Sequence, residues 1–178
     1  MTTEPNLSNP LWDFSLAVYR QPGVADACLR LQDRHGVDVN VLFCFCWLTI
    51  AEGIDLGKGD VRDLVQDTEA WCDGVVRPLR EVRRRMKPGF DGMPDVAVEA
   101  LRSEVKRLEL ESERLEQDFL FDRARDLAAR ERRDGPPAVR VEHVLDLYLG
   151  LLGATLKDAD HADCRVIIDA GQNTASAP

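Results

Sequence analysis

The sequence predicts an all-α protein, a helical bundle around one buried central helix with a single long charged helix attached. Three observations support this fold class. Residues 39–54 are apolar almost all round, as in a helix enclosed by other helices. Residues 94–133 contain no glycine or proline after Pro94 and are rich in good helix formers. No second strand-like run is present to pair with the β-branched residues of 39–54.

The first three helices can be located from residues that are typical of helix starts and ends. Ser8 or Asn9 before Pro10 is a typical helix start, with proline in the first turn. Gly36 suits the left-handed residue that ends a helix, and Asp38 can cap the next one. We therefore predict helices at 10–20, 24–35 and 39–54.

The segment 61–87 predicts a fourth helix that follows a glycine-rich link at 55–60. Gly74 and Pro78 lie inside this helix. Proline lacks a backbone donor and its ring crowds the preceding turn, so we expect a bend or two helices that meet near residues 75–77.

The end of this fourth helix has two faces. At 100° per residue, its apolar residues form one stripe and its cations gather on the other side. The apolar stripe is Val75, Leu79, Val82 and Met86. The cations, which we predict to bind an anion, are Arg77, Arg80, Arg84 and Lys87. The alternative is a solvated face neutralised by acids of the long helix.

The long helix carries apolar residues at alternating steps of three and four, with Ser112 in the one polar position. This spacing is typical of a coiled-coil seam. The predicted association seam consists of Leu101, Val105, Leu108, Leu115 and Phe119. A monomer would leave these side chains in water, so we expect the chain to pair with itself or with a helical partner.

Size and charge limit the function. With 178 residues and 44% hydrophobic content, the chain can bury one substantial core. The net charge of -9 disfavours nucleic-acid binding. The five cysteines show no paired spacing, which is typical of reduced thiols. No apolar run is long enough to span a membrane, and the N-terminus lacks a secretory signal, so we expect a cytoplasmic protein.

We divide the chain into four parts along its length. They are a helical core at 1–92, the long charged helix of the same domain at 93–134, a C-terminal helical extension at 135–171 and a disordered tail at 172–178. Apolar residues at helical spacing predict a helix at 141–152 in the extension, and a last short element is expected at 160–170.

No catalytic motif stands above chance. Asp158, His161 and Cys164 share a helix face but lack a fourth metal ligand. Asp118 and Asp122 resemble a magnesium pair without the second pair that such chemistry needs. We therefore expect no metal and no cofactor.

A set of motifs between Pro10 and Leu120 is similar to a known family. The motifs are Leu11-Trp12-Asp13-Phe14-Ser15-Leu16, Tyr19, Gly23-Val24, Cys28-Leu29, Leu31-Gln32-Asp33, Gly36-Val37-Asp38-Val39-Asn40, Trp47-Leu48, Trp71, Val76-Arg77-Pro78-Leu79-Arg80 and Arg83-Arg84. Together they resemble a family of small proteobacterial proteins catalogued only as a conserved domain of unknown function. The resemblance implies no activity, and the segment after Gly135 extends beyond it.

Two functional hypotheses follow. The first is a non-enzymatic helical interaction or adaptor protein that self-associates and binds an anionic partner or ligand through its basic helix face. The alternative is an enzyme that acts on an anionic, phosphate- or carboxylate-bearing substrate in a helical pocket. In that case Arg77, Arg80 and Arg84 bind the substrate, and Asp33 or Glu52 serves as general acid or base.

Overall fold

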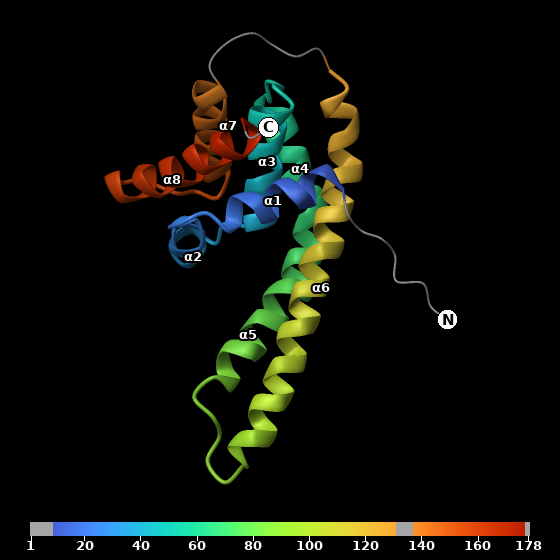
Figure 1. The fold of residues 1–178 in the computed structure, drawn as a ribbon, viewed down its shortest axis with the longest axis vertical. Helices are drawn as coiled ribbons and strands as arrows, with labels where there is room; N and C mark the ends of the chain where they lie inside the picture. The colour runs from blue at the N-terminus through green and yellow to red at the C-terminus, as the bar shows by residue number, and fades with distance from the viewer. Residues whose placement is uncertain (1–8, 131–136, 177–178) are drawn as a thin grey trace.

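The computed structural model describes residues 9–130 and 137–176, and its regular elements there are all helical, which confirms the all-α fold (Figure 1). A group of shorter helices forms a compact head, and two helices project from it as an arm. The elements are α1 (Pro10–Tyr19), α2 (Val24–His35), α3 (Val39–Cys46), η1 (Trp47–Ala51), α4 (Lys58–Trp71), η2 (Cys72–Val76), α5 (Arg77–Met86), α6 (Asp95–Ala128), α7 (Pro137–Leu151) and α8 (Asp158–Ala175).

The helix ends follow the expected capping chemistry. Asn9 Oδ1 accepts a hydrogen bond from the backbone N–H of Trp12 at 2.9 Å, and Pro10 opens α1. Gly36 ends α2 with a φ of 68°, a left-handed conformation that favours glycine. Asp38 then caps α3 by accepting from the backbone N–H of Asn40 at 2.8 Å.

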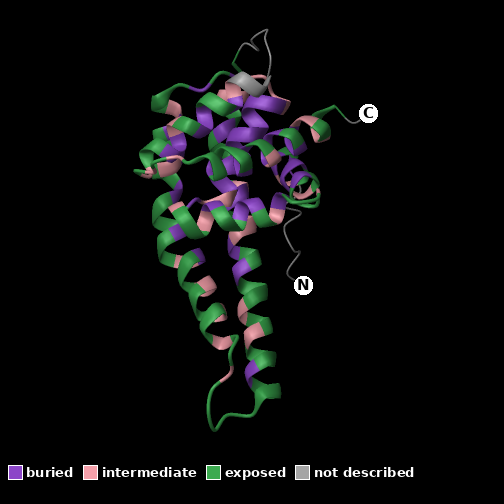
Figure 2. Ribbon diagram, turned by 90° about the vertical axis from the view of Figure 1, so that its left-hand side faces the viewer, coloured by how far each residue is buried: buried purple, intermediate pink, exposed green. Residues whose placement is uncertain are grey.

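The central helix lies at the core of the head, as predicted. Residues 40–50 are all buried, and α1, α6, α7 and α8 pack around α3 and η1 (Figure 2). Phe45 packs edge-on against Tyr148 of α7, with ring centroids 5.3 Å apart. The segment is apolar all round because every side of it meets another helix.

The predicted helix at 61–87 contains a wider turn at the expected place. Helix α4 leads into the π-helical turn η2 and then into α5, where Pro78 stands in the first turn. The backbone N–H of Arg77 bonds to the carbonyl of Cys72, five residues earlier. Because proline cannot donate to the ladder, a π-turn before it adjusts the backbone without ending the helix.

Helices α5 and α6 lie antiparallel and form the arm (Figure 1). With 34 residues, α6 is about 51 Å long, and its first half extends beyond the head. Figure 2 shows the outer arm as mostly exposed or half-buried. The long helix is confirmed with its end at Ala128. Most of its predicted continuation to residue 133 lies outside the described residues.

The C-terminal extension packs into the same core as the N-terminal helices. Leu145 and Leu149 of α7 and Ile167 of α8 are buried in the cluster that surrounds α3. Asp163 of α8 pairs with Arg30 and Arg34 of α2. Helix α8 continues to Ala175, so the expectation of a disordered tail from residue 172 is wrong for residues 172–175. Within the described residues, no helix combines the length and apolarity needed to cross a bilayer.

If the extension belongs to this single core, truncating one of its buried side chains destabilises the whole protein. We expect Leu149→Ala to lower the free energy of unfolding by about 2–5 kcal/mol, because it leaves a cavity beside α3. The partly exposed Leu151→Ala is the control and should cost less than about 1 kcal/mol. Urea unfolding followed by circular dichroism measures both; equal effects would contradict a shared core.

Candidate functional site

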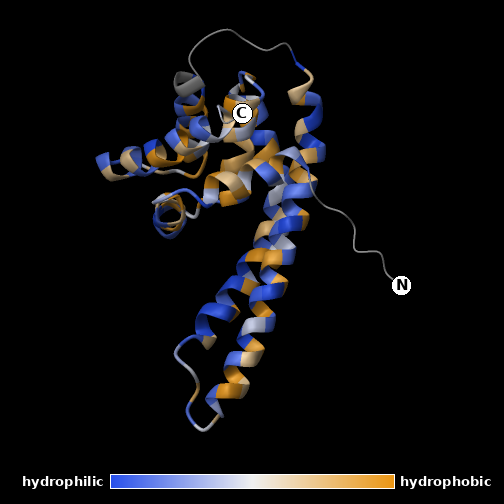
Figure 3. Cartoon of the chain, in the orientation of Figure 1, coloured by the Kyte–Doolittle hydropathy of each residue, from blue (hydrophilic) through white to orange (hydrophobic). Residues whose placement is uncertain are grey.

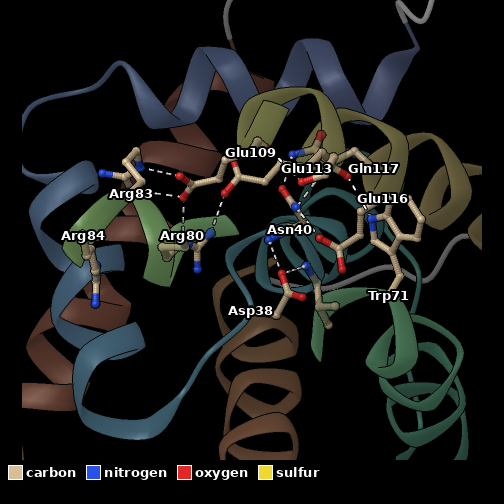
Figure 4. A network of polar contacts seen from close by, with 12 residues as sticks. Asp38, Asn40, Trp71, Arg80, Arg83, Arg84, Glu109, Glu113, Glu116 and Gln117 are labelled. Carbon is tan, nitrogen blue, oxygen red and sulfur yellow. Dashed lines mark hydrogen bonds and ion pairs between the residues drawn. The ribbon is translucent and has the colours of Figure 1, made fainter. Parts of the chain in front are cut away.

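A buried polar junction joins the base of the arm to the head. Asn40, in the first turn of α3, donates from Nδ2 to Glu116 Oε2 at 2.6 Å and accepts at Oδ1 from Gln117 Nε2 at 2.8 Å (Figure 4). One turn earlier on α6, the carbonyl of Ser112 accepts a hydrogen bond from the indole N–H of Trp71 at 3.0 Å. These bonds fix α6 against α3 and α4.

Two carboxylates and a thiol meet at this junction. One ligand atom each from Asp38, Cys72 and Glu116 lies within 4.8 Å of the other two. Asp38 Oδ2 and Glu116 Oε1 are buried and accept no hydrogen bond. Burial and the negative charge of Asp38 raise the pKa of Glu116 far above its ordinary value, and the same two causes raise the pKa of the Cys72 thiol. Charge is therefore costly in this cluster unless a cation or a proton balances it.

Two arginines of α5, Arg80 and Arg83, meet acids of α6, but only Arg80 belongs to the predicted cation stripe. Arg80 Nε donates to Glu109 Oε1 at 2.9 Å, and Arg80 also pairs with Glu113. Arg83 pairs with both oxygens of Glu109 (Figure 4). The apolar stripe of α5 is only partly covered, since Val82 is exposed. These ion pairs hold the two helices of the arm together.

Three of the four predicted anion-binding residues line one cleft. A hollow of about 310 Å³ between the end of α2 and the α5 side of the arm contains Arg77, Arg80 and Arg84, with Asp38 and Cys72 also in its lining. Arg84 donates to Asp33 at 3.0 Å, and Arg77 pairs with Asp73 and with the carbonyl of Gly36. Lys87 is exposed and lies outside the cleft lining. Anion binding here stays a prediction.

The predicted association seam lies on the exposed side of α6. Leu101, Leu108, Leu115 and Phe119 are 44–58% exposed, whereas Val105 is half-buried and Ser112 buried. Apolar residues recur along the arm in Figure 3. At the base of the arm, Leu115 and Phe119 meet Trp71 of α4 in an apolar groove of about 550 Å³.

The other predicted metal-ligating residues do not come together in the described residues. In the described residues, neither Asp158, His161 and Cys164 nor Asp118 and Asp122 belong to a group with metal-binding spacing. Asp33 lines the arginine cleft, and Glu52 does not. Glu116 and Cys72 were not predicted as site residues from the sequence, and Asp38 was predicted only as a helix cap. A buried acid in a long charged helix carries no local signal that separates it from exposed ones.

The fold and the junction define an all-α protein that combines a helical head with a two-helix arm. Residues 10–120 match the family described as "Protein of unknown function (DUF2390)", and the chain belongs to this family. The match ends within α6, so α7 and α8 lie beyond it. No curated protein and no solved structure matches the chain.

The Glu109 contacts should contribute more to stability than an exposed pair of the same helix. We expect Glu109→Ala to cost about 2–3 kcal/mol of unfolding free energy, because it leaves Arg80 and Arg83 partly buried without their shared acceptor. The matched control is Glu104→Ala, whose exposed pair with Arg107 contributes about 0–1 kcal/mol. Chemical denaturation measures the difference, and similar costs would contradict this role of Glu109.

The same contacts predict a pH dependence. Burial alone would raise the pKa of Glu109, but hydrogen bonds from Arg83 and Arg80 outweigh burial and lower this pKa below its ordinary 4.5. A carboxyl with a depressed folded pKa stabilises the fold above its unfolded pKa, and this stabilisation disappears as the pH falls through the folded value. Glu109→Gln should therefore be less stable than wild type near neutral pH. Denaturation across the pH range should show this deficit shrinking in acid; a constant deficit would argue against it.

Proposed function

We propose that the protein is a helical interaction protein that binds one helix of a protein partner along the apolar face of its arm. We call this surface the arm face and define it as Trp71, Leu101, Leu108, Leu115 and Phe119. The exposure of the four α6 residues carries the proposal. Burying each large apolar side chain against a partner contributes about 1.5–3 kcal/mol of favourable free energy, which favours binding.

The shape of the arm face suits a helix. Leu101, Leu108 and Leu115 recur every seven residues, and the stretch from Leu101 to Phe119 is about 27 Å long at 1.5 Å per residue. This length is five turns of helix. The groove beside Trp71 at one end offers a pocket for a single large apolar side chain, as in helix-in-groove recognition.

Charge along the arm face favours a basic partner over a second copy of the chain. Glu104 and Glu111 directly precede seam positions 105 and 112, so both acids lie along one edge of the arm face. Asp67 lies in the lining of the apolar groove beside Trp71. Arg107 and Arg123 offset part of this charge. In an antiparallel pairing of two copies, the acidic edges would face each other, and each chain carries a net charge of -9. A helix with lysine or arginine beside its apolar face avoids this repulsion.

Two synthetic helical peptides test the proposal. Both carry leucine at heptad spacing; one has lysine at the flanking positions and the other has glutamate. We expect the lysine peptide to bind and the glutamate peptide to bind at least about tenfold more weakly, because the edge of the arm face is acidic. Fluorescence anisotropy of labelled peptides measures both affinities.

Leu115→Glu should abolish peptide binding, because it places a charge in the apolar groove. The control is Leu29→Glu on α2, a similarly exposed leucine outside the arm face, which should bind as wild type does. Equal binding of the two peptides would overturn the basic partner. A concentration-dependent mass in light scattering that Leu115→Glu abolishes would assign the arm face to a second copy instead.

A second candidate function is the binding of a small anion in the arginine cleft. The observation in its favour is that Arg77, Arg80 and Arg84 share one lining, as an enzyme or receptor for an anionic ligand requires. The pairs of Arg77 with Asp73 and of Arg84 with Asp33 are half exposed, so a ligand displaces them at little cost.

Calorimetric titration with inorganic phosphate and with citrate tests the cleft. Arg84→Ala should weaken binding about tenfold, because a half-exposed guanidinium is the most available donor in the cleft. Arg125→Ala, an exposed residue on α6 paired with Asp122, is the control and should leave the affinity unchanged. If wild type binds neither anion, or if both variants weaken binding equally, the cleft is not an anion site.

A further inference from the structure

The group of Asp38, Cys72 and Glu116 differs from an ordinary surface acid cluster in its burial. Glu116 is 1% exposed and Cys72 is 5% exposed, and both face the interior where α3, η2 and α6 meet. No donor group elsewhere in the described residues reaches Asp38 Oδ2 or Glu116 Oε1, and both Glu116 and Cys72 lie within hydrogen-bonding reach of the Asp38 side chain, so without a cation these groups must share protons. A buried carboxylate oxygen without a donor is costly, so the cluster needs a positive charge there, and a cation can replace the shared protons.

Asn40 donates to one oxygen of each carboxylate, and the second oxygen of each has no such donor. The backbone N–H of Asn40 donates to Asp38 Oδ1 at 2.8 Å, and the side-chain Nδ2 of the same residue donates to Glu116 Oε2 at 2.6 Å. Hydrogen bonds of this kind orient the ligands in protein metal sites. Asn40 therefore positions two potential ligands at once, and Figure 4 shows both carboxylates beside it.

The third ligand is supplied by the π-turn. Cys72 is the first residue of η2, and π-turns inside α-helices occur frequently at functional sites. The structure holds four other buried cysteines, Cys28, Cys44, Cys46 and Cys164, but in the described residues only Cys72 belongs to a group with metal-binding spacing.

We propose that Asp38, Cys72 and Glu116 bind one divalent cation, Zn²⁺ by the chemistry of the ligands, and leave a fourth position open toward the arginine cleft. A thiolate selects Zn²⁺ over Mg²⁺ and Ca²⁺, while two carboxylates are compatible with it. Three protein ligands with an open position are typical of reactive zinc sites. Asp38 and Cys72 line the cleft that holds Arg77, Arg80 and Arg84.

The three ligand atoms need to move only a little to coordinate one ion. In tetrahedral zinc sites the ligand atoms lie about 3.3–3.8 Å from one another, given the usual zinc–oxygen and zinc–sulfur bond lengths. The three atoms here lie within 4.8 Å of each other, so they approach by on the order of 1 Å on binding. An anionic group that enters the cleft would meet both the cation and the arginines. Glu116 also lines the groove at the end of the arm face, but the test of the metal site does not depend on a protein partner.

Metal binding to the full-length protein tests the proposal. After treatment with a chelator, the folded protein should take up one Zn²⁺ per chain in calorimetric titration. Glu116→Gln should weaken uptake by about tenfold or more, because a neutral amide replaces a charged ligand. Co²⁺ in place of Zn²⁺ should give a near-ultraviolet thiolate-to-cobalt band in wild type and none in Cys72→Ser.

Cys164→Ser is the matched control, since Cys164 is also buried and reduced but lies outside the group. It should keep the cobalt band and the zinc affinity. A rise in the melting temperature of wild type on addition of zinc is a further measurement, and it does not depend on the folding of any variant. The proposal is overturned if folded wild type binds neither ion, if both ligand variants bind as wild type does, or if the cobalt band depends on Cys164 rather than on Cys72.

Discussion

The position of the arm depends on one buried side chain, Asn40. Its amide uses both ends at once, donating to Glu116 and accepting from Gln117. If α6 slid by one turn, about 5.4 Å, these groups would lose their partners inside the protein. Each buried polar group without a partner costs about 1–3 kcal/mol, so the contact favours a single register for the long helix. The ion pairs of Arg80 and Arg83 with Glu109 then follow from that register.

Much of the fold could be predicted because its signals are local. Asn9, Gly36 and Asp38 act on backbone groups within a few residues of themselves, so their types alone mark the helix ends. The buried helix could be recognised from its continuous apolar run, and the long helix from its lack of glycine and proline. The π-turn falls where Pro78 disturbs the ladder, although the sequence did not distinguish a π-turn from a bend.

The site was harder to predict because its members come from three separate elements. Asp38 has a sufficient local explanation as a helix cap, which conceals its free second oxygen. Glu116 looks like any other acid on a charged helix, since it is buried only by helices that are distant in the sequence. The face of α5 was predicted as two-sided, but no residue of α5 is buried and Val82 of its apolar stripe is exposed. Spacing within one helix also does not reveal which acids of another helix meet its arginines. Those partners depend on the register that Asn40 fixes.

The π-turn at Cys72–Val76 also determines where the whole of α5 points. A π-turn accommodates one residue more than the corresponding α-helical turn, and one residue corresponds to about 100° of rotation around a helix. Loss of a single residue there would turn Arg80 and Arg83 away from α6. The loop at 87–94, at the far tip of the arm, has no such role, because changes in its length do not propagate into either helix. The chain therefore tolerates insertions and deletions very unequally at the two ends of the same short helix.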